Sequence, residues 1–356
     1  TNVEYRPSKR VSMFTRLNFS YQDKILLLQH GCTDLLHLAQ RRGASLHKLL
    51  SGTSIFEQDI HKPHARLHHA DWLKLLQNCQ QQLNSPELPF LLGTALLQNR
   101  YISLSQCLLH AANLKQALSQ LHYFRHQLFP GVYVQQYRKQ QCVVLEFNTG
   151  LTLGQQHSTA ITMLFSLLLS LIKQQLGSSK GISAQLKQQP AQSELTYQLH
   201  WGCAVSFNQP CDSLLIDYPV WHQAFPATDP VKFAAARRTC RQLNRVLPRQ
   251  RGLLEQVCRL QRRALPALLS LEQAAQQLGL SASTLKRQLS LHKTNFAQLL
   301  DSVRRDAARQ LLQQGCYSNR QLACKLGYSD EHNFRRAFKR WTGLIPSSFK
   351  ELQNSH

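Results

Sequence analysis

Residues 321–350 read "QLACKLGYSDEHNFRRAFKRWTGLIPSSFK", and this stretch decides how the C-terminal third of the chain folds. Phe334, Phe338 and Trp341 recur at helical spacing, so they share one helix face that can be buried. The same helix also carries four cations: Arg335, Arg336, Lys339 and Arg340. A basic amphipathic helix by itself fits a solvated face, a membrane surface or a nucleic-acid partner, so the surrounding sequence must decide.

The beginning of this stretch has an earlier copy. "SLEQAAQQLGLS" (270–281) and "SNRQLACKLGYS" (318–329) share six of twelve residues at a constant offset of 48. In each copy Ser-x-x-Gln forms a capping box that starts a helix, and a glycine provides the positive φ that ends it. A final serine then caps the next helix. The two copies therefore predict two helix-turn-helix units.

The second helices of the two units also match each other. Leu285 and Leu289 correspond to Phe334 and Phe338, and two adjacent cations follow the first apolar residue of each pair. Each second helix is thus expected to bury one face and to direct its cations away from that face.

The segment between the units, "NFAQLLDSVRRDAARQLLQQG" (295–315), predicts one long connecting helix. One apolar stripe is expected along it, formed by Leu300, Val303, Ala307 and Leu311. A helix of ~18 residues spans about 27 Å at 1.5 Å per residue. That length could hold two recognition helices near one DNA turn, ~34 Å, apart.

The charge of the chain favours a polyanionic partner for its C-terminal part. Residues 1–227 carry 19 basic and 11 acidic side chains, a net charge of +8, whereas residues 228–356 carry 23 and 8, a net charge of +15. A basic excess concentrated in about a third of the chain is the expected footprint of nucleic-acid binding.

Several classes of protein are not supported by the sequence. The ten cysteines include no C-x-x-C pair, which argues against a zinc site or a compact disulfide framework and fits a cytoplasmic protein with reduced thiols. The longest apolar run, "ITMLFSLLLSLI" (161–172), has 12 residues, so we expect a buried helix and no membrane insertion.

Catalytic and metal-binding motifs are not found either. "HKPHARLHH" (61–69) contains four histidines, but no cysteine or carboxylate is placed to complete a metal site. No Walker, Rossmann or G-x-S-x-G pattern occurs. We therefore predict a protein that is not an enzyme and has no metal, cofactor or catalytic residues.

The N-terminal part mixes helical and strand patterns. Residues 21 to about 128 have mainly helical patterns, "VYVQQYRKQQCVVLEF" (132–147) alternates like a hairpin, and an apolar helix is expected over 158–176. "ELTYQLHW" (194–201) and "AVSFNQPCDSLLID" (204–217) have strand-like patterns. An α+β domain is the expected fold.

The C-terminal motifs closely resemble those of AraC/XylS-type transcription regulators over residues 265–351. The matching motifs are Leu322-Ala323, Gly327-Tyr328-Ser329, "FRRAFKR" (334–340), and Gly343 followed by Pro346 and Phe349. The N-terminal part is similar to the arabinose-binding-type regulatory domain found in some members. The predicted fold is an α+β N-terminal regulatory domain followed by an all-α domain with two helix-turn-helix units joined by a long connecting helix.

Four segments follow from these patterns. We expect an N-terminal tail over 1–20, an effector-binding or dimerisation domain over 21–226, a helical linker over 227–264 and a double helix-turn-helix DNA-binding domain over 265–356.

The resemblance also implies which residues contact double-stranded DNA. The base-reading positions are Ser283, Lys286, Arg287, Glu331, His332, Arg335 and Arg336, and Arg340 is expected to contribute general affinity. Lysine and arginine suit guanine O6 and N7, while serine, histidine and glutamate can pair with other base edges. The family often has a bulky residue at the position of Ser283, so the preferred DNA sequence does not carry over from a relative.

The resemblance further implies an activator that works with RNA polymerase and responds to a small effector. The apolar residues of the expected pocket walls favour a largely apolar effector, and the net charge of +8 favours an anionic group on it, such as a carboxylate. The pocket walls are expected near 132–147 and 195–207, against helix 158–172. A homodimer is expected, through the N-terminal domain or through helices 230–263, where Cys240, Leu243 and Leu247 form a stripe. Two alternatives stay open: an N-terminal domain that only dimerises, and a non-specific architectural DNA-binding protein.

Overall fold

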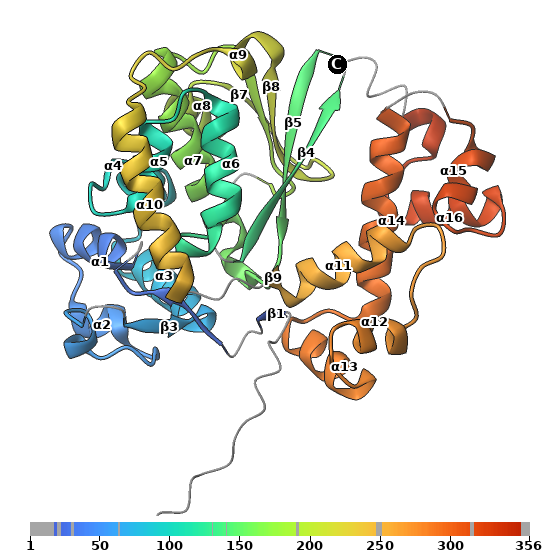
Figure 1. Cartoon of the computed structure of the whole chain (residues 1–356), viewed down its shortest axis with the longest axis horizontal. Helices are drawn as coiled ribbons and strands as arrows, with labels where there is room; N and C mark the ends of the chain where they lie inside the picture. The colour runs from blue at the N-terminus through green and yellow to red at the C-terminus, as the bar shows by residue number, and fades with distance from the viewer. Residues whose placement is uncertain are drawn as a thin grey trace, which may run out of the picture.

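The computed structural model has an N-terminal α/β body and a C-terminal helical body (Figure 1). It describes residues 18–19, 23–29, 32–62, 65–129, 131–139, 141–189, 192–246, 251–313 and 317–349. The predicted mixed domain with a sheet, followed by a helical helix-turn-helix domain, is thereby confirmed.

The N-terminal body begins with short strands and a layer of helices. These elements are β1 (Asn18–Phe19), β2 (Lys24–Leu27), α1 (Cys32–Arg41), α2 (Leu46–Leu50), η1 (Glu57–Asp59), β3 (Arg66–His68), α3 (His69–Leu83), α4 (Leu88–Gln98), α5 (Ser103–Leu109), α6 (Leu114–Phe124) and η2 (Arg125–Gln127). Strand β2 pairs antiparallel with β3, and β1 pairs with β9 (Arg251–Gly252) from the C-terminal part.

A five-stranded sheet forms the centre of the molecule. Its strands are β4 (Val132–Lys139), β5 (Cys142–Thr149), β6 (Ile182–Gln185), β7 (Ala204–Ser206) and β8 (Asp212–Asp217), in the order β4-β5-β8-β6-β7. All neighbours are antiparallel except β6 and β7. The β4–β5 pairing confirms the hairpin predicted at 132–147.

Helix α7 (His157–Leu176), preceded by η3 (Gly154–Gln156), is the core helix of this body. It packs on α4, where Gly93 lets the two backbones approach so closely that any Cβ would collide with the carbonyl of Met163. The segment Gly154–Leu176 is long and apolar enough to cross a membrane, which the 12-residue run had not suggested, but 78% of its apolar window is buried inside the protein. A buried core helix passes the same test of length and composition.

Two predicted elements were assigned wrongly. Residues 194–201 form helix α8 (Glu194–Trp201), because Ser193 caps its start, Gly202 ends it in the left-handed region, and Tyr197 and Trp201 are buried four residues apart. Residues 24–27 form a strand although we predicted a helix there. A short apolar run that is buried on both faces does not reveal its period.

Two helices lead from the N-terminal body to the C-terminal body, after the short helix α9 (Tyr218–His222). Helix α10 (Pro230–Val246) packs on α5 and α6, and α11 (Leu253–Ala264) packs on α14 (Phe296–Gln313). The predicted linker over 227–264 therefore contains two helices, of which α10 belongs to the N-terminal body and α11 to the C-terminal body. The buried Cys240 faces Cys107 of α5, so this residue of the predicted stripe serves an internal contact, whereas Leu243 is half-buried and Leu247 lies outside the described residues.

The C-terminal body contains the two predicted helix pairs. They are α12 (Leu271–Gln277) with α13 (Ala282–Leu291) and α15 (Asn319–Lys325) with α16 (Glu331–Thr342). Both capping boxes form, at Ser270 and Ser318, and both turn glycines, Gly279 and Gly327, have a positive φ.

Helix α14 has 18 residues, as predicted, but it uses more than the one predicted stripe. Its first half packs Leu299 and Val303 into the core of the first helix pair, and its second half packs Ala308 and Leu312 into that of the second. Leu300 is only partly buried. A further face, which the sequence did not reveal, buries the charged residues Asp306 and Arg309.

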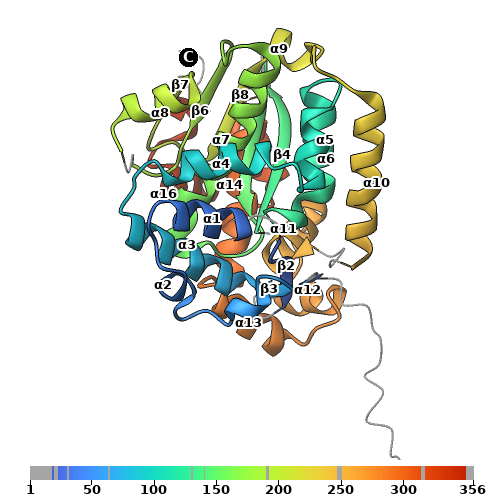
Figure 2. The ribbon, with the colours of Figure 1, turned by 90° about the vertical axis from the view of Figure 1, so that its left-hand side faces the viewer.

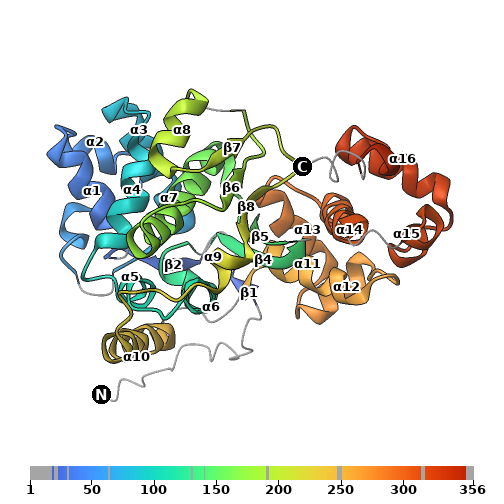
Figure 3. The same ribbon diagram turned by 90° about the horizontal axis from the view of Figure 1, so that it is seen from above.

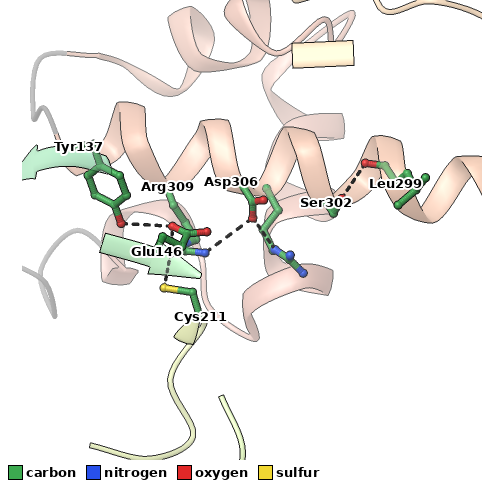
Figure 4. A network of polar contacts seen from close by, with 8 residues as sticks. Tyr137, Glu146, Cys211, Leu299, Ser302, Asp306 and Arg309 are labelled. Atoms are coloured by element: carbon green, nitrogen blue, oxygen red, sulfur yellow. Dashed lines mark hydrogen bonds and ion pairs between the residues drawn. The ribbon is translucent and has the colours of Figure 1, made fainter. Parts of the chain in front are cut away.

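That charged face contacts the sheet of the N-terminal body (Figure 4). Arg309 and Glu146 of β5 are 3% and 2% exposed, and Arg309 Nη2 donates to Glu146 Oε2 at 3.1 Å. The same nitrogen donates to Cys211 Sγ at 2.8 Å, and the Tyr137 hydroxyl donates to Glu146 at 3.3 Å. We call the Arg309–Glu146 pair the latch.

A second buried ion pair joins the bodies at α11. Arg125 Nη2 donates to both carboxylate oxygens of Glu255, at 2.8 and 2.7 Å. Close by, the backbones of Gly150 and Gly252 approach so closely that a side chain at Gly252 would collide with the carbonyl of Gly150. The bodies therefore meet closely in the middle of β5, at Glu146, and just beyond its end, at Gly150.

Two buried histidines hold Thr152 between the bodies. His69 Nε2 donates to the Thr152 carbonyl at 3.0 Å, and the Thr152 amide donates to His292 Nδ1 at 3.4 Å. Burial lowers the pKa of both histidines to about 4, so both are neutral at pH 7. A protonated His292 could no longer accept the Thr152 amide.

We expect acid to weaken this fold. Each histidine has a pKa of about 4 when folded and an ordinary value of 6.5, so the unfolded chain binds more protons between these pH values. The free energy of unfolding is therefore highest above about pH 6.5. It falls by up to roughly 3 kcal/mol per histidine as the pH falls towards 4. Urea unfolding between pH 7 and 4.5 measures this.

The variant His292→Gln should flatten this pH dependence, whereas His47→Gln on the exposed surface should not change it. An unchanged pH slope in His292→Gln would contradict the assignment.

Candidate nucleic-acid interface

The first candidate recognition helix is α13. Ser281 caps it by accepting from the Thr284 amide at 3.2 Å, and Leu285 and Leu289 are fully buried in the core beneath. With these residues fixed inwards, Ser283, Lys286 and Arg287 are all exposed. The predicted division between buried and exposed positions is observed.

The second candidate recognition helix is α16. Asp330 caps it by accepting from the Asn333 amide at 2.7 Å, and Phe334 and Phe338 are fully buried. The predicted contact residues on it are exposed, except Glu331, which is half-buried at the first turn: Glu331, His332, Arg335, Arg336 and Arg340. Both helices thus present their predicted residues to solvent.

Polar contacts already orient two of these arginines. Arg336 Nη2 donates to Asn333 Oδ1 at 2.6 Å, and Asn333 in turn donates to Asp330. Arg340 forms an exposed ion pair with Asp301 of α14 at 2.8 Å. Sequence reasoning missed Asn333 and Asp301 as positioning residues. Asn333 could have been noticed from its place one turn before Arg336, but Asp301 is 39 residues from its partner and gives no local signal.

The two helix pairs are tied together through α14. Arg304 donates from Nε to the Leu326 carbonyl and from Nη2 to that of Gly327, both at 3.1 Å, and its guanidinium lies 4.5 Å from the centre of the Tyr328 ring. Gly327 also lies against the Pro266 carbonyl, where a Cβ would collide. The glycine turn therefore serves two purposes: a positive φ and a close contact between the units.

The views agree on where the second unit lies. Figures 1 and 3 show α15 and α16 on the opposite side of the sheet from α10 and the helices of the N-terminal body. Figure 2 shows the N-terminal helices in front and the C-terminal helices behind them. The second candidate recognition helix, α16, is consequently not covered by the N-terminal body.

A cleft of about 550 Å³ lies between the two bodies. Its lining includes Tyr133 and Phe147 from the sheet and Leu254 and Leu299 from the helical body, together with the cations Lys187 and Arg305. The sheet wall falls within the predicted stretch 132–147, but helix 158–172 and the stretch 195–207 do not line this cleft. Those stretches instead fill the core of the N-terminal body or, for much of α8, face solvent.

The structure reveals no cluster typical of a metal site in the part of the chain that it describes: no three His, Cys, Asp or Glu side chains gather there. Of the histidines of 61–69, His61 lies in a turn and His68 in β3, and His64 lies outside the described residues.

Comparisons with known proteins agree with this architecture. The family described as "Arabinose-binding domain of AraC transcription regulator, N-term" matches residues 43–225, and a helix-turn-helix domain family matches residues 274–351. The chain is 28% identical over 323 residues to the Ornithine utilization regulator of Pseudomonas aeruginosa, covering 89% of this chain and 94% of that protein.

Two further similarities were found. The HTH-type transcriptional regulator VirS of Mycobacterium tuberculosis is 31% identical over 160 residues, which cover 44% of this chain and 46% of that protein. The crystal structure of the transcriptional regulator CdpR from Pseudomonas aeruginosa covers 90% of this chain and 97% of its own, at 20% identity and a TM-score of 0.42.

The arabinose-binding-type match alone covers more than half of the 356 residues. The helix-turn-helix match includes both exposed recognition helices described above. The chain therefore belongs to the AraC family of DNA-binding transcriptional regulators with an arabinose-binding-type N-terminal domain, and it is not an enzyme.

Proposed function

We propose that the protein reads a specific DNA sequence through α13 and α16 and activates transcription in response to a small carboxylic acid. The observation that carries the proposal is the latch. Through it the N-terminal body, which we call the sensor body here, holds α14, the helix that joins both DNA-reading units. Any change in the sensor body at this contact would change how α13 and α16 are presented to DNA.

Base reading is assigned to the exposed residues of the two recognition helices. Arginine can contact guanine O6 and N7 in a bidentate manner, which supports this role for Arg287 and Arg336. Arg340 is exposed and contacts Asp301 of α14, and it suits a phosphate contact, which adds affinity without sequence information. A non-specific architectural protein would have no need for two separately capped recognition helices.

The effector is assigned to the cleft between the bodies. Its walls come from the sheet on one side and from α11 and α14 on the other, so a ligand there contacts both bodies. Tyr133 and Leu254 suit an apolar portion, and Lys187 or Arg305 suits a carboxylate. One relative is named for the utilization of ornithine, which also carries a carboxylate.

The Arg309–Glu146 pair is a contact that a ligand could rearrange. Burial alone would lower the pKa of the Arg309 guanidinium, but Cys211 and Glu146 raise it overall, so Arg309 keeps its charge. Arg309 Nε has no hydrogen-bond partner among the described residues. A buried pair whose hydrogen bonds are incomplete recovers less of its desolvation penalty, so a ligand that favours another arrangement has less to overcome.

A homodimer is proposed through the N-terminal body. Helix α8 exposes Leu195 and Leu199, 62% and 72% accessible, four residues apart on one face. This small apolar face is a candidate contact between two copies. A cytoplasmic location and contact with RNA polymerase belong to the same proposal and follow from the family.

Substitution of the recognition arginines tests base reading. Arg336→Ala should weaken the preferred site by ~1–3 kcal/mol and relax the preference at one base pair. Arg340→Ala should weaken all sequences about equally and reduce the salt dependence of binding. In vitro selection followed by fluorescence anisotropy at several salt concentrations measures both. Equal loss on all sequences in Arg336→Ala would reassign that residue to phosphate contact.

A double substitution tests control by the sensor body. Arg309→Met with Glu146→Leu removes both charges and leaves neither one buried without its partner. We expect DNA binding to persist and its response to the effector to be lost.

Native mass spectrometry followed by extraction should identify a co-purified carboxylic acid. If the purified protein carries no ligand and no carboxylic acid in a metabolite screen alters DNA binding, a sensor body that only dimerises is the better explanation.

Sedimentation tests the dimer. Leu195→Glu with Leu199→Glu should convert a dimer to a monomer at micromolar concentration, because like charges would meet across the contact. The exposed Tyr101→Glu serves as a control and should leave the dimer intact. A strict monomer of the unmodified protein, with and without DNA, would refute the dimer.

A further inference from the structure

A second cavity, of about 380 Å³, lies where η2 and the end of α6 meet α10. Its lining residues are His122, Tyr123, Arg125, His126, Arg241, Asn244 and Arg245. Figures 1 and 3 place α10 on the opposite side of the sheet from the recognition helix α16. The cavity is therefore separate from both the cleft between the bodies and the second DNA-reading unit.

The charge of this cavity is unbalanced. Three arginines line it, and its described lining includes no carboxylate. Among the described residues, neither Arg241 nor Arg245 has an ion-pair partner, whereas Arg125 has its partner outside the cavity, at Glu255. Like charges gathered in one cavity repel each other, and a bound anion would offset this repulsion.

The cavity is also built on fixed elements. Gln127 Nε2 donates to the Cys240 carbonyl at 2.9 Å and to Asn244 Oδ1 at 3.0 Å, which holds α10 against η2. Arg125 is buried, and its Nη1 donates to the His122 carbonyl at 2.9 Å, while its Nε has no hydrogen-bond partner among the described residues. An anion would therefore meet a guanidinium that its protein partners have already oriented.

We propose that this cavity binds a compact small molecule carrying at least two negative charges, as phosphoryl groups or carboxylates. Planar guanidinium groups match the oxygen geometry of both kinds of anion. The size of the cavity suits a small metabolite and excludes a duplex. Arg241 and Arg245 supply the exposed side of the site, and Arg125 supplies the buried side.

Arg125 connects this site to the DNA-binding body. The same guanidinium that lines the cavity holds Glu255 of α11, and α11 packs on α14 in the core of the first helix pair. An anion that shares Arg125 weakens its hold on Glu255, because the two acceptors compete for one set of donors. Binding of the anion and binding of DNA are then coupled, and this coupling alone rests on the proposed function. The coupling must be equal in both directions.

Isothermal titration calorimetry of the full chain tests the site, with pyrophosphate and citrate as separate probes. We expect at least one probe to bind, and which one binds decides between phosphoryl and carboxylate chemistry. Arg241→Ala with Arg245→Ala should weaken binding at least ~10-fold, since charge-assisted hydrogen bonds are lost. Arg238→Ala, an exposed position on the same helix that does not line the cavity, should leave the affinity unchanged.

A second variant separates this site from the DNA-binding surface. Arg287→Ala with Arg336→Ala removes cations that any anion could contact in place of DNA, and binding of the probe should be unaffected. If this variant loses the probe and the Arg241/Arg245 variant keeps it, the anion merely imitates DNA phosphate and the proposal is overturned. No binding of either probe overturns it equally.

The coupling has its own readout. The DNA affinity of the full chain, measured at matched ionic strength with and without the probe, should change by the same factor by which DNA changes the probe affinity. The change should vanish in the Arg241/Arg245 variant. If the probe binds at the cavity but DNA affinity stays constant, the coupling through Arg125 is wrong. Failure of DNA binding without any probe would instead count against the proposed function.

Discussion

The buried contact between Arg309 and Glu146 is the constraint on which the relation of the two bodies depends. A charge in a dry interface is unfavourable unless its partner is in place, so α14 and the β4–β5 hairpin must meet at this position. The outer face of the hairpin carries Tyr137 and Glu146, while its inner face carries Val143, Leu145 and Phe147 in the N-terminal core. One hairpin thus belongs to two interfaces.

The same constraint links the N-terminal body and both helix-turn-helix units through one helix. Helix α14 places Leu299 in the core of the first unit, Leu312 in that of the second and Arg309 against the sheet. A change at any one of these faces shifts the helix against the other two, because closely packed interfaces move between discrete arrangements more readily than they deform continuously. The cleft and the arginine-lined cavity both lie beside contacts that fix this arrangement.

Much of the C-terminal body was predictable from local signals. Capping boxes, turn glycines and the i, i+4 spacing of Phe334 and Phe338 are short-range features whose physics is complete within a few residues. The same signals separated the exposed Arg287 and Arg336 from the core. Local signals failed at α8 and at β2, where short apolar patterns fit both a helix and a strand until tertiary burial selects one.

The sequence by itself determined the two capped helix pairs, the length of α14, the β4–β5 hairpin and the concentration of basic charge, because each depends on neighbours in the chain. Only the tertiary structure decided that Arg309 meets Glu146, 163 residues away, and that Arg125 meets Glu255. A buried charge on a helix has no periodic signature that distinguishes it from an exposed one. The partner that makes such burial possible is brought by the fold.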